Sequence, residues 1–450
     1  MALNLLQTAL KSRSPIVPCN GQPSNSVGFD GEFAIDVNTG ITYFKDSVLG
    51  WISGINLAGG AGKWTLGQQY VGLVATRCKA PTAGGYSVKS HMARTIHTAR
   101  TNITQIGAAF ANWYCNGLTE VGAGGPCTIT ASIEYPLGSP VTRLTFGGQT
   151  SGTAYDFSTL ESDLAILAIP AGAQFAIREY RIYPGNGDVV FTGFTGNSSI
   201  GPDTSAGDCY VYTGATDLTG STGAFASTDG SSYAPAVAVF GPTNQPSYAI
   251  IGDSIFEGYQ DTPNGNLYVG GAARSIGPTR AYTNLAKFGE MLSAVAGAST
   301  GFNQRSAIAT KFSTHILCNY GVNDLFSNAV SSNYLIRNLL TLRQQFPNQW
   351  FYQTTITPET TSTDSWATPG NQTTVSAAAE TNRQQANNFL RSGIGGVGVG
   401  GFDGVFDVTS IIETNTNTGI WKSPGYTIDG VHPVAMSYGL IATSQIIQVQ

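Results

Sequence analysis

Short apolar runs that alternate with longer helical segments constrain the fold of this chain more than any other feature. The first run, at 248–251, is uninterrupted, and the others lie at 315–320, 350–356 and 404–408. Helical segments are predicted at 280–295, 334–346 and 377–390, with a last helix starting near Pro433. Uninterrupted apolar runs are typical of strands that are buried on both faces. The alternation therefore predicts an α/β/α three-layer domain with a parallel sheet over residues 244–450.

Three polar motifs accompany these elements, and the first two directly follow predicted strands. They read Gly252-Asp253-Ser254, Gly321-Val322-Asn323-Asp324 and Asp429-Gly430-Val431-His432. A serine hydroxyl is a poor nucleophile until an imidazole removes its proton, and the imidazole needs a third group to orient it. The oxyanion that forms during acyl transfer needs hydrogen-bond donors, such as an amide. In chain order, the motifs supply these parts of an acyl-transfer site.

Each motif also has a simpler structural interpretation. Ser254 after Gly-Asp suits a helix N-cap or a turn, and the Asn323-Asp324 pair suits a turn at the end of a strand. His432 suits a surface turn, and His315 at the start of an apolar run suits a structural histidine. The joint occurrence of the motifs, in this order and near strand ends, favours catalysis over these alternatives.

The order and spacing of the motifs resemble those of the SGNH (GDSL-like) hydrolase family over roughly residues 245–450. The resemblance implies that Ser254 is the nucleophile, that His432 is the general base and that Asp429 orients His432. It implies a serine hydrolase that needs no cofactor and no metal. Asp253 and Asp324, the acidic residues of the first two motifs, are assigned supporting roles.

The same resemblance implies an oxyanion hole with three donors. These are the backbone N–H of Ser254, the backbone N–H of Gly289 and the side-chain amide of Asn323. Gly289 is chosen because it ends the pattern Asn-x-x-x-x-Gly at 284–289. Gly297 and Gly301 follow closely and are the alternatives for this position.

Residues 66–243 have the pattern of an all-β domain. Strand-like runs at 128–135, 164–169 and 174–178 end at Pro- and Gly-containing turns. Short strands at this spacing predict an antiparallel β-sandwich of jelly-roll type. Such a domain binds carbohydrate, or it supports the active site and mediates assembly. The segment 241–246, Gly-Pro-Thr-Asn-Gln-Pro, predicts the boundary with the α/β domain.

Composition excludes several classes of protein. Charged residues are only 11% of the 450 residues and the net charge is −5, so a nucleic-acid partner is not expected. No apolar stretch is long enough to insert in a membrane, and residues 1–6 do not begin a Sec signal peptide. The six cysteines show no CxxC motif, which predicts no zinc site. Free, buried thiols are expected, and a disulfide between Cys115 and Cys127 is the alternative.

Residues 1–65 are predicted to form an attachment module. The segment 28–45 reads as a strand, an Asn-Thr-Gly turn and a second strand. It resembles small hairpin modules of phage tail-fibre and tailspike proteins. The resemblance implies a virion protein, released at host lysis, that contacts other virion proteins and forms a homo-oligomer, a trimer by analogy.

Three functions are compatible with these features. The first is a serine esterase that removes O-acetyl groups from a bacterial surface polysaccharide, as part of a tail fibre or tailspike. The second is a structural or receptor-binding virion protein whose hydrolase domain is degenerate. The third is a free lipase or thioesterase. The polar segment at 257–266 favours a hydroxyl-rich substrate over a long acyl chain.

Overall fold

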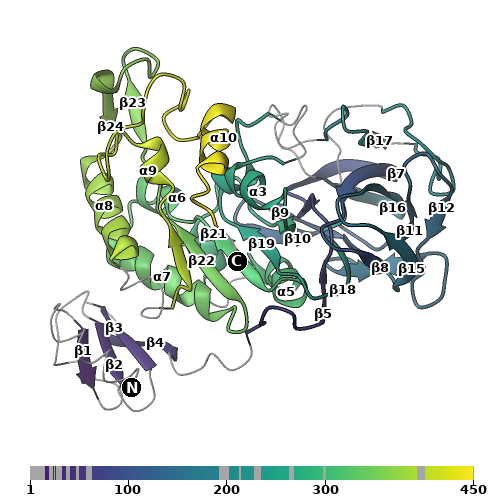
Figure 1. Cartoon of the computed structure of the whole chain (residues 1–450), viewed down its shortest axis with the longest axis horizontal. Helices are drawn as coiled ribbons and strands as arrows, with labels where there is room; N and C mark the ends of the chain where they lie inside the picture. The colour runs from purple at the N-terminus through teal and green to yellow at the C-terminus, as the bar shows by residue number, and fades with distance from the viewer. Residues whose placement is uncertain are drawn as a thin grey trace.

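The C-terminal half of the protein, seen in a computed structural model, is a parallel sheet with helices on both faces (Figure 1). All neighbouring strands in this sheet are parallel. Its order is β25 (Gly404–Phe406), β22 (Trp350–Thr354), β21 (His315–Cys318), β19 (Ser247–Ile251), β20 (Ala281–Asn284) and β6 (Cys78–Lys79). The structure describes residues 16–19, 24, 26, 33–36, 41–46, 50–56, 63–191, 202–211, 214–227, 235–262, 268–296, 301–392 and 401–448.

Side chains of the central strand β19 alternate between two cores. Ala249 and Ile251 pack into a core with helices α5 (Asn303–Phe312), α7 (Ser332–Gln344) and α8 (Ala377–Arg391). Tyr248 and Ile250 pack into the opposite core with α3 (Gly271–Ile276), α9 (Thr409–Ile412) and α10 (Ala435–Thr443). Both faces of the strand are therefore buried, which explains why its sequence is continuously apolar.

The predicted strands of this half are confirmed as β19, β21, β22 and β25. The helices predicted at 334–346, at 377–390 and after Pro433 are confirmed as α7, α8 and α10. The helix predicted at 280–295 is wrong. Its first part is the strand β20, whose Tyr282 and Thr283 have side chains that favour strands. Gly289 has a left-handed φ of 71°, so only α4 (Leu292–Val295) is helical.

The region before β19 is rich in antiparallel strands, as predicted. One sheet has the order β12 (Val141–Arg143), β11 (Cys127–Glu134), β16 (Gln174–Phe191), β7 (Ala83–Thr98) and β17 (Cys209–Val211), with β13 (Gly152–Ala154) beside β11. The other has the order β14 (Thr159–Glu161), β8 (Ile103–Ala111), β18 (Ala238–Thr243) and β5 (Tyr70–Leu73), with β15 (Ala165–Ile169) beside β8. Phe110 of β8 and Phe175 of β16 belong to one core between the sheets. The jelly-roll topology stays a prediction.

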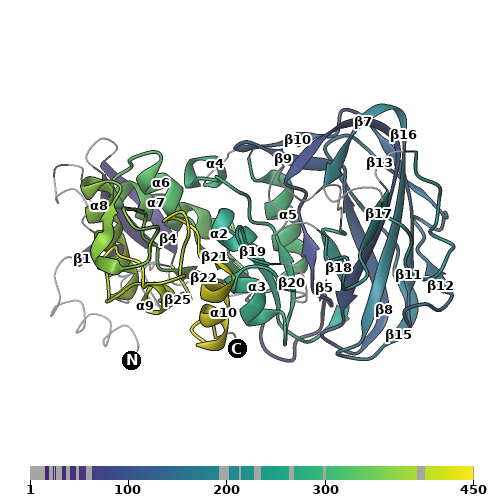
Figure 2. The same cartoon turned by 90° about the horizontal axis from the view of Figure 1, so that it is seen from above.

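This β-rich region and the α/β half are joined by more than the chain between β18 and β19 (Figure 2). The edge strand β6 comes from the β-rich region and pairs with β20. A single apolar core includes Phe240 of β18 and Phe312 of α5, whose rings stack with centroids 4.8 Å apart. The parallel sheet therefore extends across the predicted boundary at 243/244.

The N-terminal strands form a separate sheet. Its order is β1 (Ile16–Cys19), β2 (Phe33–Asp36), β3 (Ile41–Asp46) and β4 (Gly50–Asn56). Strands β2 and β3 pair antiparallel, which confirms the predicted strands, whereas the turn at 37–40 lies outside the described residues. The role of this module in virion attachment stays a prediction.

Five cysteines, Cys78, Cys115, Cys127, Cys209 and Cys318, are free and buried, as predicted. The side chain of Cys19 lies outside the described residues. Within the part of the chain that the structure describes, none of the helices is both long and apolar enough to span a membrane.

Candidate active site

Ser254 stands at the carboxyl end of β19, on a sharp turn into the short helix α2 (Ser254–Glu257). Gly252 makes this turn possible because it has a φ of 152°, and a Cβ there would lie 1.6 Å from Oδ1 of Asn319. That same Oδ1 accepts a hydrogen bond from the backbone N–H of Asp253 at 3.2 Å. Glycine is therefore required for the approach of the two strand ends that fixes the position of Ser254.

Asp253, a predicted supporting residue, is the N-cap of α2. Its Oδ1 accepts from the backbone N–H of Ile255 at 2.9 Å and from the amide of Asn319 at 2.9 Å. Its Oδ2 is buried and has no hydrogen-bond partner among the described residues. Burial raises the pKa of Asp253 to about 6. The carboxyl group therefore holds the turn that carries the nucleophile, through α2 and Asn319.

His432 connects the first and third motifs. Its Nε2 lies 2.8 Å from Oγ of Ser254, and its Nδ1 lies 2.7 Å from Oδ2 of Asp429. The imidazole packs against two rings, Tyr259 at a centroid distance of 4.5 Å and Phe288 at 6.1 Å. The structure thus brings Ser254, His432 and Asp429 into one chain of hydrogen bonds, with an imidazole that packs against two aromatic side chains.

Asp429 accepts several hydrogen bonds besides the one from His432. Its Oδ1 accepts from the backbone N–H groups of Val431 and His432, each at 2.9 Å. Gln260 donates to Oδ2 through Nε2 at 2.6 Å. Burial opposes ionisation, but these hydrogen bonds and the charge of His432 outweigh it and lower the pKa of Asp429 to about 2. The carboxylate is therefore ionised at neutral pH.

Gln260 is a site residue that the sequence analysis missed. It has a left-handed φ of 64°, which directs its amide toward Asp429. Glutamine has no special preference for this backbone conformation, so the sequence carries no signal for it. Asn319, also missed, did leave a signal, because it is a polar residue within the apolar run at 315–320.

The loop that carries Gly289 is tied to the turn at Ser254, and the side chain of Asn323 is tied to that loop. The backbone N–H of Lys287 donates to the carbonyl of Gly252 at 2.9 Å, and that of Phe288 donates to Glu257 at 2.6 Å. These bonds hold the loop that carries Gly289. Asn323 lies in the first turn of α6 (Val322–Phe326) and donates through Nδ2 to the carbonyl of Glu290 at 3.0 Å. Asn323 is thereby fixed beside the Gly289 loop with a second N–H still available.

The alternatives for Gly289 differ in their surroundings. A Cβ at Gly289 would meet nothing within 4 Å, which leaves open space beside its backbone. Gly301 instead lies in close contact with the carbonyls of Leu118 and Ala294, so it is a packing glycine. Gly297 lies outside the described residues.

Asp324, the other predicted supporting residue, binds the segment that follows Gly289. Both of its carboxylate oxygens accept from the backbone N–H of Leu292, at 2.9 and 3.1 Å. Burial raises the pKa of Asp324 to about 7. It connects α6, which carries Asn323, to α4, which follows Gly289.

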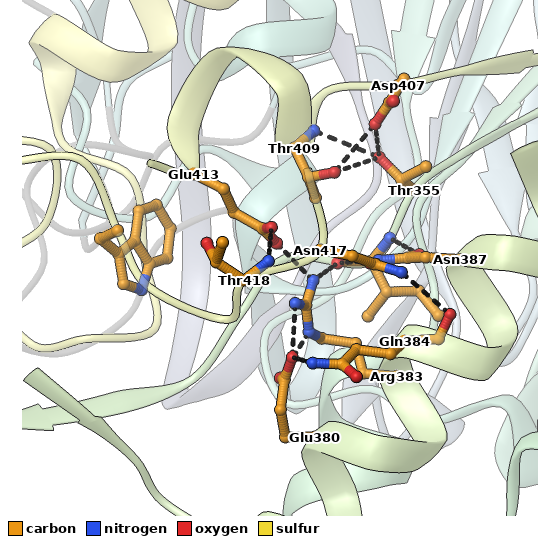
Figure 3. A network of polar contacts seen from close by, with 12 residues as sticks. Thr355, Glu380, Arg383, Gln384, Asn387, Asp407, Thr409, Glu413, Asn417 and Thr418 are labelled. Carbon is orange, nitrogen blue, oxygen red and sulfur yellow. Dashed lines mark hydrogen bonds and ion pairs between the residues drawn. The ribbon is translucent and has the colours of Figure 1, made fainter. Parts of the chain in front are cut away.

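A second polar network, around Arg383 and Asn387 of α8, holds the loop after β22 (Figure 3). Asn387 of α8 accepts from the backbone N–H of Ile356 and donates to its carbonyl, at 2.7 and 2.9 Å. Arg383 donates to the same carbonyl and pairs with the buried carboxylates of Glu380 and Glu413. The side chain of Ile356 fills the space where a Cβ on Gly321 would lie. The network therefore fixes the start of the second motif.

The other histidines lie away from this arrangement. His315 is buried among Trp64, Tyr248 and Tyr352, and burial lowers its pKa to about 3. His91 and His97 are buried in β7. The structural interpretation of His315 is consistent with these surroundings. Among the described residues, no group of three or more His, Cys, Asp or Glu side chains is placed to hold a metal ion.

The GDSL-like Lipase/Acylhydrolase family matches residues 248–444 of the chain. No curated protein matches it. Similar solved structures include the carbohydrate acetylesterase Est24 from Sinorhizobium meliloti, which is 14% identical, with 45% of this chain and 98% of that chain covered and a TM-score of 0.33. A family two carbohydrate esterase from Clostridium thermocellum is 13% identical, with 85% of this chain and 98% of that chain covered and a TM-score of 0.31.

A lipase/acylhydrolase from Enterococcus faecalis is 15% identical, with 45% of this chain and 95% of that chain covered and a TM-score of 0.29. The fold of the C-terminal half, its three motifs and the family match point to the same class of protein. Residues 248–444 form a domain of the GDSL-like lipase/acylhydrolase (SGNH) family.

Proposed function

We propose that the protein is a serine esterase that removes O-acetyl groups from a bacterial surface polysaccharide. The observation that carries the proposal is the hydrogen-bonded chain from Ser254 through His432 to Asp429. The chain has the geometry in which an imidazole takes the proton of a serine hydroxyl while a carboxylate holds its other nitrogen.

The reaction follows from this geometry in two steps. Ser254 Oγ attacks the acetyl carbonyl carbon as His432 Nε2 takes the Oγ proton, and the oxyanion accepts hydrogen bonds from Ser254 N–H, Gly289 N–H and Asn323 Nδ2. The C–O bond to the sugar breaks as His432 returns the proton to the sugar oxygen, leaving acetyl-Ser254. Water then attacks the acetyl carbon as His432 takes its proton. The bond between the acetyl carbon and Ser254 Oγ breaks as His432 returns that proton to Oγ, which releases acetic acid and restores the serine.

The rim of the site supports a hydroxyl-rich substrate. The indole of Trp366 lies against Gly430, two residues before His432 in the sequence, and donates to Thr360 Oγ1 at 2.9 Å. Trp366 is only partly buried, so part of its ring remains available for stacking on a sugar. Glu359 is close enough to His432 and Asp429 for their charges to affect its pKa, which burial raises. A ring face and a carboxyl group beside the triad suit a sugar better than an acyl chain.

Two alternatives are separated by one set of measurements. The purified protein is assayed on p-nitrophenyl acetate, octanoate and palmitate, and acetate release is measured from O-acetylated polysaccharides of bacteria that it binds. We expect hydrolysis of acetate esters, poor hydrolysis of long-chain esters, and loss of several orders of magnitude in Ser254→Ala. Preference for palmitate supports the lipase or thioesterase function. No hydrolysis of any ester supports a degenerate domain in a structural protein.

Trp366→Ala tests whether the substrate is a polysaccharide that stacks on this ring. The substitution should raise KM for the polysaccharide and leave kcat/KM for p-nitrophenyl acetate nearly unchanged, because the small ester has no sugar to stack. Equal effects on both substrates would exclude the stacking role.

The setting on a virion rests on the resemblance of residues 28–45 to tail-fibre modules. An esterase carried on a phage particle would remove acetyl groups from the surface polymer of the host during attachment. Antibody labelling of particles tests this setting independently of the enzyme assays. The trimeric state is tested by light scattering of the full-length protein.

A further inference from the structure

Glu120, in the β-rich region, caps a helix of the hydrolase domain. It lies in strand β10 (Thr119–Gly122), which forms a hairpin with β9 (Trp113–Asn116). Its carboxylate accepts from the backbone N–H groups of Gln304 and Arg305, at 2.6 and 3.1 Å. These residues begin α5, whose N-cap Phe302 provides no side-chain acceptor. The first N–H groups of a helix lack partners within the helix, so Glu120 supplies the missing acceptor from another part of the chain.

Arg305 extends this contact toward the active site. Its side chain is fully buried and donates through Nε to Glu120 at 2.9 Å. Its two terminal nitrogens bind both carboxylate oxygens of Glu290, at 2.7 and 2.5 Å. Tyr320, which directly precedes Gly321 of the second motif, donates to Glu290 at 2.5 Å. The two hydrogen bonds between the Arg305 guanidinium and the Glu290 carboxylate fix the relative orientation of the two groups as well as the distance between them.

Glu290 is next to Gly289 in the chain and contacts Asn323 directly. Its backbone carbonyl accepts from Asn323 Nδ2 at 3.0 Å. We infer that Glu120 is a positioning residue for the oxyanion hole, acting through Arg305 and Glu290 on Asn323. The β-rich region thus contributes to the reaction of the hydrolase domain. This inference rests on the proposed esterase function.

The three charged groups of this contact are buried, so the loss of any one of them should disturb the structure around the others. Glu120, Arg305 and Glu290 are each at most 5% exposed. When one partner of a buried ion pair is lost, the remaining charge is left without compensation and the structure around it moves. Such a movement reaches the donors, and misplacement of a donor by about 1 Å costs up to roughly 10²-fold in rate.

The test compares two substitutions at the same interface. Glu120→Gln removes the charge but keeps a similar shape, and we expect kcat for p-nitrophenyl acetate to fall about tenfold with KM little changed. Glu161→Gln is the matched control, because Glu161 binds Lys311 of the same helix α5 but is 33% exposed and Lys311 is 57% exposed. It should leave kcat unchanged. Assays are made well below the melting temperature of each full-length variant, so lower stability alone does not reduce kcat.

A double-mutant cycle identifies the path of the effect. If Glu120 acts through Asn323, Glu120→Gln should cost little further activity in the Asn323→Ala background. Tyr320→Phe, which removes one hydrogen bond to Glu290 and retains the ring, should lower kcat severalfold with the same coupling. This variant tests the inference if Glu120→Gln fails to fold. Unchanged kcat, or additive effects with Asn323→Ala, would overturn the inference. Absence of hydrolysis by the wild type would instead overturn the proposed function.

Discussion

At the scale of single residues, the site depends on contacts that place a few polar groups with little freedom. Asp429 accepts from His432, from Gln260 and from two backbone N–H groups. Charged acceptors make hydrogen bonds stronger than neutral ones do. Hydrogen bonds to both of its oxygens therefore fix the Asp429 carboxylate, which orients His432. Gln260 donates one of these hydrogen bonds.

Substitution of Gln260 should separate a positioning role from a packing role. Gln260→Ala removes one charge-assisted hydrogen bond to Asp429 and should lower kcat roughly tenfold with little change in KM. Gln260→Glu keeps the shape but places a second carboxylate beside Asp429, so it should lower kcat more than Gln260→Ala does, because the two like charges repel. Steady-state kinetics of the two variants and the wild type make the comparison. Activity equal to wild type in both variants would exclude a role for Gln260.

The raised pKa of Asp324 predicts that the stability of the folded protein depends on pH. Its pKa is about 7 in the folded protein and about 3.9 in an unfolded chain. Between these values the folded state binds the proton more tightly, so stability falls as pH rises from about 4 through 7. Asp324→Asn keeps an acceptor for Leu292 and has no proton to lose.

Thermal unfolding at pH 5 and pH 8 tests this expectation for Asp324. The melting temperature of the variant should exceed that of the wild type by more at pH 8 than at pH 5. Asp429, whose pKa is lowered, has the opposite sign, since its contribution is lost only as pH falls toward 2. A wild type and variant that differ equally at both pH values would contradict the assignment of the pH effect to Asp324.

A candidate residue could be identified from the sequence only where the chemistry restricts which type of residue can perform the role. Only serine, histidine and a carboxylate in a defined order provide the triad, so Ser254, His432 and Asp429 were identifiable. Gln260 was not, because its role depends on a left-handed backbone that glutamine rarely adopts. The β-region residue Glu120 was not identifiable either, since its partner Arg305 is 185 residues away in the chain.

At the scale of elements, the loop that carries Asp429 and His432 is shaped by a neighbouring hairpin. Strands β23 (Thr360–Ser362) and β24 (Gln372–Thr374) pair antiparallel beside it. The backbone N–H of Thr360 donates to the carbonyl of Gly430 at 3.0 Å. A Cβ on Gly430 would lie 1.9 Å from the carbonyl oxygen of Thr360. The hairpin therefore restricts the position of the third motif.

Gly430→Ala should disturb catalysis, and Gly425→Ala serves as its control. Both glycines have a left-handed φ, 79° and 77°, but a Cβ on Gly425 would meet only Met436, at 3.7 Å. Both substitutions carry the cost of that conformation, whereas only the first moves the loop away from Thr360. We expect kcat to fall at least tenfold in Gly430→Ala and at most about twofold in Gly425→Ala. Equal losses would show that backbone strain alone is responsible.

Elements were predictable where burial left a recognisable pattern in the sequence. Helices α7 and α8 have a helical period, and strands β19 and β21 lie in mainly apolar runs, so these elements were found. The segment 280–295 was misjudged because β20 contains the polar residues Thr283 and Asn284 and so forms no apolar run, although it is buried on both faces. Pairing with β19, which the sequence does not show, decided its conformation.

At the scale of the whole molecule, the β-rich region and the hydrolase domain share a sheet and a core. Strand β6 completes the parallel sheet, and Phe240 and Phe312 stack between the regions. Sequence composition separates the two regions because their local patterns differ. It does not show their common core, which is formed by residues far apart in the chain. The shared core predicts that the two regions unfold together.

Phe175→Ala, a substitution far from the hydrolase domain in the sequence, tests whether the two regions unfold together. Phe175 is fully buried between the two antiparallel sheets, in the core that belongs to the β-rich region alone. The cavity should cost about 3–5 kcal/mol, and a common transition would transmit this loss to the hydrolase domain. We therefore expect the temperature at which esterase activity is lost to fall together with the circular-dichroism transition. Activity that survives at the wild-type temperature, after the β-rich region has melted, would show that the regions unfold independently despite their shared core.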